Sequence, residues 1–405
     1  AGVGQNRLAP DQGVTTGLSS QVITSQLDIR FPNTTQAIYA KLVEKCGERL
    51  YWENWAAEVG EIAKKYIARI KRLVCGGNPT LVGEFGLFVR TLQQNINQGI
   101  TTDQCVEMLA QHLITRPVFE ALFSEYKFVT NNSISSSMQR MVELLEREAV
   151  DKDLTELGKF YHSVRTNIGQ IDNLAGKQTV IKNLYEKFFK LAFPLTVEKL
   201  GTVYTPIECV DFILHSVDDV LKKEFDTSLT QEGVHILDPF TGTGTFVTRL
   251  LQSGLIRPED MRRKYLSEIH VNEIILLAYY IADVNIESVF QAVCPQEEYL
   301  PFNGICLTDT FQLSESDEGL VINEFFRENS EEVEKQRKTP IRVIIGNPPY
   351  SVGQKSANDN AQNQRYPNLE KRIEDTYVVN SVAKNMTSLY DSYIKAFRWA
   401  TDRIA

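Results

Sequence analysis

The stretch Ile344-Ile345-Gly346-Asn347-Pro348-Pro349-Tyr350 joins an apolar, β-branched run to residues that cannot continue a central strand. Neither proline can donate a hydrogen bond to a neighbouring strand, so the strand must end near Gly346 and lead into a rigid loop. Within four positions this loop carries an amide, a carbonyl on a residue without an N–H, and an aromatic ring. These groups can together hold a flat, amino-bearing molecule such as a nucleobase.

The region around this loop indicates an α/β fold. From about residue 180 strand and helix patterns alternate, which favours an α/β domain with a largely parallel sheet. The predicted strands are 234–237, 265–273, 304–307 and 341–345, and the predicted helices are 183–190, 209–221, 245–252, 274–283, 322–336 and 388–404.

The first half of the chain has a different character. Apolar residues recur at helical spacing and no strand alternation stands out, which predicts an all-α helical domain. We expect helices over 55–76, 81–95, 102–113, 117–125, 134–148 and 153–171. Residues 1–30 are rich in Gly, Ser, Thr and Gln and are interpreted as an extended lead-in or linker. The predicted organisation is therefore a linker over 1–30, a helical domain over 31–180 and an α/β domain over 181–405.

Composition excludes several classes of protein. The 405 residues are 42% hydrophobic and 23% charged, which is ordinary for a globular protein. No apolar run could span a membrane. The six cysteines are scattered without the spacing of zinc ligands, and we expect them to be buried, reduced thiols. We expect a cytoplasmic protein with no metal site and no membrane contact. A net charge of -9 means that any contact with DNA must be local.

One helix carries a row of basic residues, which are Lys64, Lys65, Arg69, Lys71 and Arg72. They form either a solvated face opposite the apolar stripe or a ridge that contacts phosphates. The sequence leaves both interpretations open.

A glycine-containing turn follows the first predicted strand, in Asp238-Pro239-Phe240-Thr241-Gly242-Thr243-Gly244-Thr245-Phe246. Two glycines spaced by one residue permit positive φ and let a ligand approach the backbone, and Asp238 lies at the carboxyl end of the strand, where ligands bind in doubly wound sheets. The turn is not a phosphate loop, because no Gly-Lys-Ser/Thr follows, and it departs from the dinucleotide fingerprint at its later positions. Alone it could be structural.

Acidic residues near the next two strands complete a possible adenosine pocket. Glu273 is placed to accept both hydroxyls of a ribose, with Glu268 as the alternative if the strand register differs. Asp309, after the third strand, could accept a hydrogen bond from an adenine amino group. The three acids describe a nucleoside site without a diphosphate clamp.

The order of these motifs resembles that of γ-class, S-adenosylmethionine-dependent DNA adenine-N6 methyltransferases. The matching residues are Tyr204-Thr205-Pro206, Asp238-Pro239-Phe240-x-Gly242-x-Gly244-x-Phe246, Glu273, Asp309 and Asn347-Pro348-Pro349-Tyr350. The resemblance implies a Rossmann-like methyltransferase domain over about residues 181–405. It also implies a methyl-donor pocket lined by Thr205, Asp238, Gly242, Gly244, Phe246, Glu273 and Asp309.

The chemistry of adenine agrees with the residues of the loop. The N6 lone pair is delocalised into the ring, so the amine is a poor nucleophile. The side-chain oxygen of Asn347 and the carbonyl of Pro348 can accept both N6 hydrogens and aim the lone pair at the methyl group. Tyr350 would stack on an adenine that is flipped out of the duplex. Transfer is then direct, with no metal and no covalent enzyme intermediate, whereas the alternative is a proline-rich turn with a packing tyrosine.

The arrangement of both halves is similar to the coupler-plus-methyltransferase portion of Type ISP restriction-modification enzymes. The phrases that carry this likeness are Leu184-Tyr185-Glu186-x-Phe188, Gly201-x-Val203-Tyr204-Thr205-Pro206 and Glu268-Ile269-His270-x-Asn272-Glu273-Ile274. It implies that the partners are double-stranded DNA and the translocase, nuclease and target recognition domains of the same polypeptide. No ATP-binding loop, helicase box or nuclease constellation occurs in this chain. We expect a C-terminally incomplete α/β domain in an internal fragment that is inactive alone.

Two other functions remain open. The same loop can hold any planar amide, so N-methylation of a protein glutamine is an alternative reaction. The chain could also act as a non-catalytic scaffold that couples DNA recognition to a motor. The polar segment 351–371 is either a mobile loop that closes over the target base or simply disordered.

Overall fold

The computed structural model describes residues 49–76, 78–123, 131–147, 193, 205–315, 325–349, 365–382 and 387–404. These residues all belong to one compact unit, 49–405. Among them, no helix combines the length and apolar character that crossing a membrane requires.

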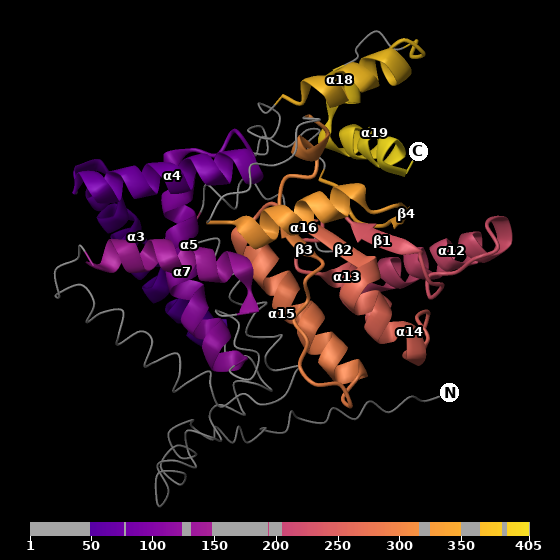
Figure 1. Ribbon diagram of the computed structural model, residues 1–405, viewed down its shortest axis with the longest axis horizontal. Coiled ribbons are helices and arrows are strands. Elements are labelled where there is room, and N and C mark those ends of the chain that lie inside the picture. Colours follow the sequence, from indigo (N-terminus) through magenta and orange to yellow (C-terminus); the bar gives the residue numbers. More distant parts are fainter. Residues whose placement is uncertain are drawn as a thin grey trace, which may run out of the picture. The chain divides into compact units, whose positions relative to one another are not determined.

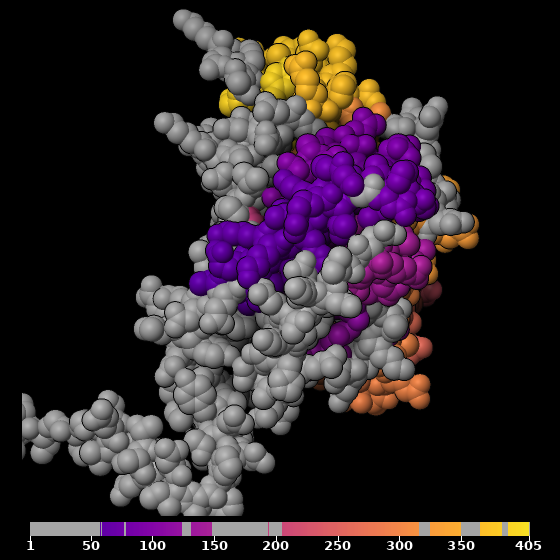
Figure 2. All heavy atoms as spheres, turned by 90° about the vertical axis from the view of Figure 1, so that its left-hand side faces the viewer, coloured from indigo at the N-terminus to yellow at the C-terminus, as the bar shows by residue number. Residues whose placement is uncertain are grey.

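In the part described up to residue 147 all regular secondary structure is helical, as the sequence predicts. Its helices are α3 (Arg49–Gly76), α4 (Pro79–Asn95), α5 (Thr102–Leu122) and α7 (Ser133–Arg147). Asn78 caps α4 by accepting a hydrogen bond from Thr80 N at 2.9 Å. Thr101 and Gln104 form a reciprocal capping box at the start of α5. Figure 2 looks onto the side of the molecule that these helices form.

The prediction of separate helices over 102–113 and 117–125 is wrong, because α5 is continuous from Thr102 to Leu122. A proline inside a helix removes a hydrogen bond and usually ends or bends it. Pro117 is nevertheless buried within α5, among apolar residues that include Val118 and Phe119. Packing of both halves of α5 in one core therefore outweighs the local cost of the proline.

The α/β region contains a four-stranded parallel sheet. Its strands are β1 (His235–Asp238), β2 (Ile269–Glu273), β3 (Ile305–Leu307) and β4 (Ile341–Ile344), in the order β3-β2-β1-β4. Asp238 pairs with Val271, and Glu273 pairs with Leu307. The predicted parallel sheet is confirmed for these strands, whose carboxyl ends meet at one edge. Between β1 and β4 the direction in which strands are added reverses.

Helices cover both faces of the sheet (Figure 1). The helices of this region are α12 (Ile207–Glu224), α13 (Thr245–Gln252), α14 (Pro258–Arg263), α15 (Leu276–Val293), α16 (Arg327–Lys338), α18 (Pro367–Ile373) and α19 (Ser392–Ile404). Ile236 and Val343 belong to the large core that includes α13, α15 and the helical region. Leu237 belongs to a smaller core with Leu369 of α18 and Trp399 of α19. Neighbouring strand residues thus face opposite layers.

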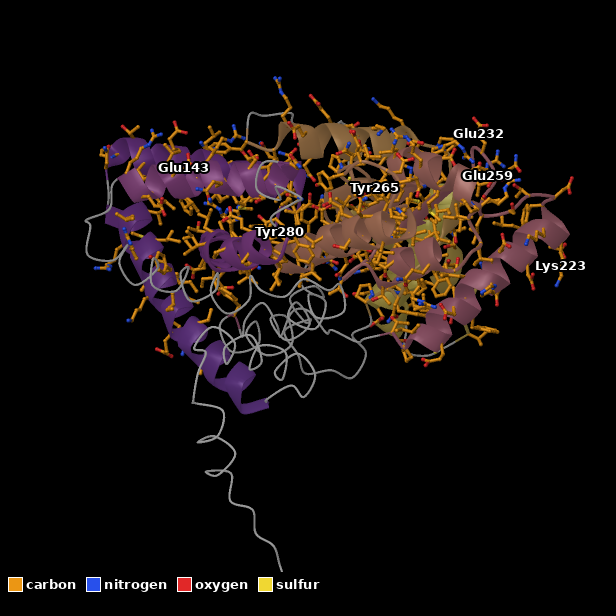
Figure 3. The ribbon with its side chains drawn as sticks, turned by 90° about the horizontal axis from the view of Figure 1, so that it is seen from below. Glu143, Lys223, Glu232, Glu259, Tyr265 and Tyr280 are labelled. Atoms are coloured by element: carbon orange, nitrogen blue, oxygen red, sulfur yellow. The ribbon has the colours of Figure 1, made fainter. Side chains whose placement is uncertain are left out.

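Two further predictions need correction. The first four residues of the predicted strand 265–273 belong instead to a π-helical turn, Lys264–Glu268, after α14, and β2 begins at Ile269. Tyr265, labelled in Figure 3, lies in that turn and is fully buried. Its ring stacks on Phe290 with 3.7 Å between ring centroids, so this residue packs in the core without belonging to a strand. The prediction of a loop over 351–371 is wrong for Pro367–Ile373, which is α18.

Several predictions lie outside the described residues. They are the lead-in over 1–30, the helices over 153–171 and 183–190, the domain boundary near 180 and the loop over 351–364. Of the cysteines that the structure describes, Cys75 and Cys209 are exposed, contrary to expectation, and the others are buried free thiols. Within the described ranges no group of three or more His, Cys, Asp or Glu side chains could hold a metal ion.

Candidate functional site

Asp238 ends β1 at the carboxyl edge of the sheet. Its Oδ1 accepts a hydrogen bond from Phe240 N at 3.2 Å. Its Oδ2 is buried and has no hydrogen-bond partner among the described residues. Burial raises the pKa of Asp238 to about 7, because a carboxylate loses its hydration there. A ligand with a hydrogen-bond donor or a positive charge would stabilise the ionised form.

The two glycines of the turn have different surroundings. Gly242 has φ +56° and Gly244 has φ +85°, so both adopt the left-handed conformation that glycine permits. A Cβ on Gly242 would meet nothing within 4 Å, which leaves room for a ligand. A Cβ on Gly244 would lie 3.3 Å from Ala282 Cα of α15. The close approach of α13 to α15 thus requires Gly244, and Gly242 presents the open side of the turn.

Glu273 ends β2 and supports the same turn. Its Oε2 accepts from Gly242 N at 2.8 Å, and its Oε1 accepts from Ile274 N and Ile275 N, each at 2.9 Å. Burial raises its pKa to about 7, and the negative charge of Asp238 adds to this effect. Glu268, the alternative residue, precedes β2 and pairs with Lys264 at 2.8 Å, so it lies at the opposite end of the strand.

Phe246 and Asp309 are both deeply buried. Phe246, in the first turn of α13, is 3% exposed and belongs to the large core. Asp309 follows β3, and its oxygens accept hydrogen bonds from Asn97, Tyr366 and Phe311 N. The role of each in donor binding stays a prediction.

The loop after β4 returns to the glycine-containing turn that follows β1. Asn347 Nδ2 donates to Thr205 Oγ1 at 3.1 Å, which joins two of the predicted site residues. A Cβ on Gly346 would lie 2.7 Å from Asp238 Oδ1, so only glycine lets the loop pass the carboxylate. The structure thus brings Thr205, Asp238 and Asn347 into one neighbourhood. Pro348 is partly exposed there, and Tyr350 lies outside the described residues.

Residues that the sequence analysis did not single out also hold this site. Asn285 of α15 donates to Thr243 O at 3.0 Å, and Thr310 Oγ1 donates to Pro239 O at 2.7 Å, so both fix the glycine turn. Asn97 and Tyr366 approach Asp309 from segments far away in the chain. An Asn two residues before Gly99 does indicate a turn, but nothing local indicates that Asn97 meets Asp309.

Comparisons with known proteins give a consistent family. Residues 51–176 match the model of the Type ISP restriction-modification enzyme coupler domain. No curated protein sequence matches the chain. The ATP-dependent Type ISP restriction-modification enzyme LlaBIII, solved bound to DNA, is 48% identical to this chain with a TM-score of 0.81. The match covers 91% of this chain and 25% of the LlaBIII chain.

Two other solved structures are similar. A nuclease-deletion mutant of the Type ISP enzyme LlaGI, in complex with a DNA substrate mimic, is 46% identical with a TM-score of 0.79, over 94% of this chain and 31% of its own. A DrdV–DNA complex is 32% identical with a TM-score of 0.77, over 95% of this chain and 36% of its own. The chain thus spans about a quarter to a third of these relatives. It belongs to the Type ISP restriction-modification enzyme family, as the sequence resemblance predicts.

Proposed function

We propose that this chain carries the S-adenosylmethionine-dependent adenine-N6 methyltransferase site of a Type ISP enzyme. The carrying observation is that Asn347, in the candidate nucleobase loop, bonds to Thr205 while Gly346 lies against Asp238. The two candidate subsites, one for the base and one for the donor, therefore adjoin at the carboxyl ends of β1 and β4. In doubly wound sheets this reversal of strand order is where ligands bind.

The residues of the donor subsite fit this cofactor. When bound, S-adenosylmethionine supplies an electrophilic methyl group on a positively charged sulfur. Asp238 Oδ2 is buried without a partner in the described part of the chain, and Gly242, in the turn that follows, leaves open space at its Cβ position. Burial raises the pKa of both Asp238 and Glu273, so a nearby positive charge would favour their ionised forms. The pocket is therefore suited to a cationic nucleoside.

Asn347 and Pro348 hold the adenine in this proposal. Because Asn347 Nδ2 donates to Thr205, its Oδ1 is the atom that accepts from the adenine amino group. The carbonyl of Pro348 accepts the second N6 hydrogen. Both bonds draw the nitrogen toward tetrahedral geometry, which frees its lone pair for direct methyl transfer. Tyr350 stacks on the flipped base.

The helical region would serve as the coupler. The related structures contain DNA, and we infer that double-stranded DNA is also the substrate here. Nuclease, ATP-dependent translocase and target recognition domains would be its partners in the same polypeptide, which we place in the cytoplasm. Buried hydrogen bonds link the two regions, for example His112 Nδ1 with Tyr280 OH at 3.0 Å. These links also favour a second candidate function, a coupling scaffold.

The test uses the full-length protein with labelled S-adenosylmethionine and duplex DNA. We expect N6-methyladenine from the wild type and at least a hundredfold lower rate from Asn347→Ala, with donor affinity within about threefold. Asn380→Ala, at an exposed asparagine, is the matched control and should retain full activity.

Three outcomes would contradict the proposal. Absence of N6-methyladenine in the wild-type reaction would overturn the DNA methyltransferase function. Label on a protein glutamine would identify the alternative substrate. Failure to bind the donor at all, with intact coupling of DNA recognition to translocation, would favour the scaffold.

A further inference from the structure

Asp309 lies where three segments of the chain meet. Its Oδ2 accepts from Asn97 Nδ2 at 2.5 Å and from Tyr366 OH at 2.8 Å. Its Oδ1 accepts from Phe311 N at 2.9 Å and from Gln312 N at 3.4 Å. Asn97 and Asp309 are each 4% exposed and Tyr366 is 5% exposed, so water does not compete for these bonds.

Asn97 is oriented toward Asp309 by its own turn. It lies between α4 and α5, and its Oδ1 accepts from Gly99 N at 2.7 Å. The Nδ2 group therefore faces the carboxylate, since the amide oxygen is already engaged. The backbone joins at the same place, because Asp309 N donates to Ile96 O at 3.3 Å. The helical region thus contacts Asp309 through both main chain and side chain.

Tyr366 connects Asp309 to the glycine turn. It precedes α18, and its ring packs edge-on against Phe311 with 5.4 Å between centroids. Phe311 in turn packs against Phe240 at 5.3 Å, and Phe240 N is the donor that contacts Asp238. One set of contacts therefore runs from the helical region through Asp309 to the proposed donor pocket.

The hydrogen bonds determine which oxygen of Asp309 can meet a ligand. A carboxylate oxygen has two lone pairs, so Asn97 and Tyr366 together fill Oδ2. Oδ1 accepts from Phe311 N at 2.9 Å and from Gln312 N at 3.4 Å. The bond from Gln312 N is the longest of the four, and the amino group of an adenine would take its place. Burial raises the pKa of Asp309, and the bonds from Tyr366 and Asn97 oppose this by stabilising the ionised form. Without them the carboxyl group would protonate or turn more readily.

We propose that Asn97, in the coupler region, is a positioning residue that fixes Asp309 for recognition of the adenine of the methyl donor. Tyr366 acts with it from the segment that follows the Asn-Pro-Pro loop. This inference rests on the proposed function, because it assumes that Asp309 meets the donor. It assigns to the coupler a direct effect on donor selectivity, in addition to linking domains.

The test compares two ligands by calorimetry on the full-length protein. They are S-adenosylhomocysteine and its analogue with hydrogen in place of the adenine amino group. Wild type should prefer the amino compound at least tenfold, since a hydrogen bond to a charged group is lost with the analogue. Asn97→Ala and Tyr366→Phe should reduce this preference below about threefold, with affinity for the analogue changed by less than about twofold.

Asn95→Ala is the matched control. Asn95 is buried two residues away, and its Oδ1 accepts from Ser330 Oγ at 3.1 Å, so this variant breaks a bond between the helical region and α16 without touching Asp309. It should keep the wild-type preference. Tyr366→Phe removes only the hydroxyl and keeps the ring that packs against Phe311, so a parallel loss of preference in that variant guards against misfolding of Asn97→Ala.

The outcomes separate the two proposals. If Asn97→Ala keeps the tenfold preference, or weakens binding of both ligands equally, the inference about Asn97 is wrong. An equal loss for both ligands is what a purely structural role would produce. If wild type binds neither ligand, the methyltransferase proposal itself fails, and the role of Asn97 fails with it.

Discussion

The hydrogen bond between Asn347 and Thr205 connects residues that are 142 positions apart. In the proposed site it fixes which end of the Asn347 amide would face the base, so Thr205→Val should let the amide turn. A positioning hydrogen bond is worth about 1 kcal/mol, which predicts a fall in kcat of roughly five- to tenfold. Thr205→Ser keeps the hydroxyl and should stay near the wild-type rate. Single-turnover methylation would measure both variants, and an unchanged rate in the valine variant would contradict this role.

Gly346 has a steric reason to lack a side chain. In Gly346→Ala the new Cβ would lie 2.7 Å from Asp238 Oδ1, so the carboxylate or the loop must move. We expect a loss of stability of about 1–3 kcal/mol and weaker donor binding, measured by urea unfolding and calorimetry. Gly83→Ala is the contrasting control, because Gly83 is exposed within α4 with nothing near its Cβ position. That variant should be stabilised by about 0.5–1 kcal/mol, and equal behaviour of the two would refute the steric argument.

The sequence predicts the positions of the site residues that lie at strand ends. Parallel strands bring Asp238 and the Asn347 loop to one edge, and both residues are found there. The contact between Asn97 and Asp309 spans 212 positions and involves a turn of the helical region. Tertiary packing creates such a contact, so no local pattern could indicate it.

Among the helices, α15 carries two buried acids one turn apart. Asp283 Oδ2 accepts from Asn132 Nδ2 at 2.6 Å, and Glu287 accepts from Phe302 N at 3.0 Å. Burial raises the pKa of Asp283 to about 7. Burial and then the charge of Asp283 raise the pKa of Glu287. In the folded protein both acids therefore favour their protonated forms.

This pair makes the stability of the fold depend on pH. A folded-state pKa above the unfolded value means that the folded protein binds the proton more tightly, so the free energy of unfolding falls as pH rises from about 4 to about 7. Asp283→Asn removes this loss and should gain at least about 1 kcal/mol relative to wild type between pH 5 and pH 8. Urea unfolding across that range would measure the difference.

The control for this prediction is Glu232→Gln, at an exposed position before β1 (Figure 3). Its stability relative to wild type should stay constant over the same pH range. If Asp283→Asn also shows a constant difference, the buried carboxyl is not the source of the pH dependence.

The same acids explain why α15 is longer than predicted. The sequence predicts a helix over 274–283, whereas α15 ends at Val293. Asp283, Asn285 and Glu287 interrupt the apolar pattern, yet Asp283 and Glu287 are buried because distant groups satisfy them. By contrast α13 matches the predicted range 245–252, since Gly244 marks its start locally.

Across the whole described unit, the helical and α/β regions share one apolar core. The large cluster contains residues from Val59 to Ile345. Tyr280 of α15 is labelled in Figure 3. Phe119 of α5 meets this tyrosine edge-on, with 6.1 Å between ring centroids, and His112 bonds to its hydroxyl. Breaking these contacts would expose core from both regions, so neither should unfold alone.

We therefore predict one cooperative unfolding transition for the two regions. Phe119→Ala should lower the free energy of unfolding by about 3–5 kcal/mol, and it should move the entire transition although the substitution lies in the helical region. Phe212→Ala, at a phenylalanine of α12 that is 73% exposed, should leave the transition nearly unchanged. Differential scanning calorimetry of the chain would distinguish the cases. Two separate transitions, of which Phe119→Ala moves only one, would show that the coupler and the α/β region are independently stable, and that a signal could not pass between them through this core.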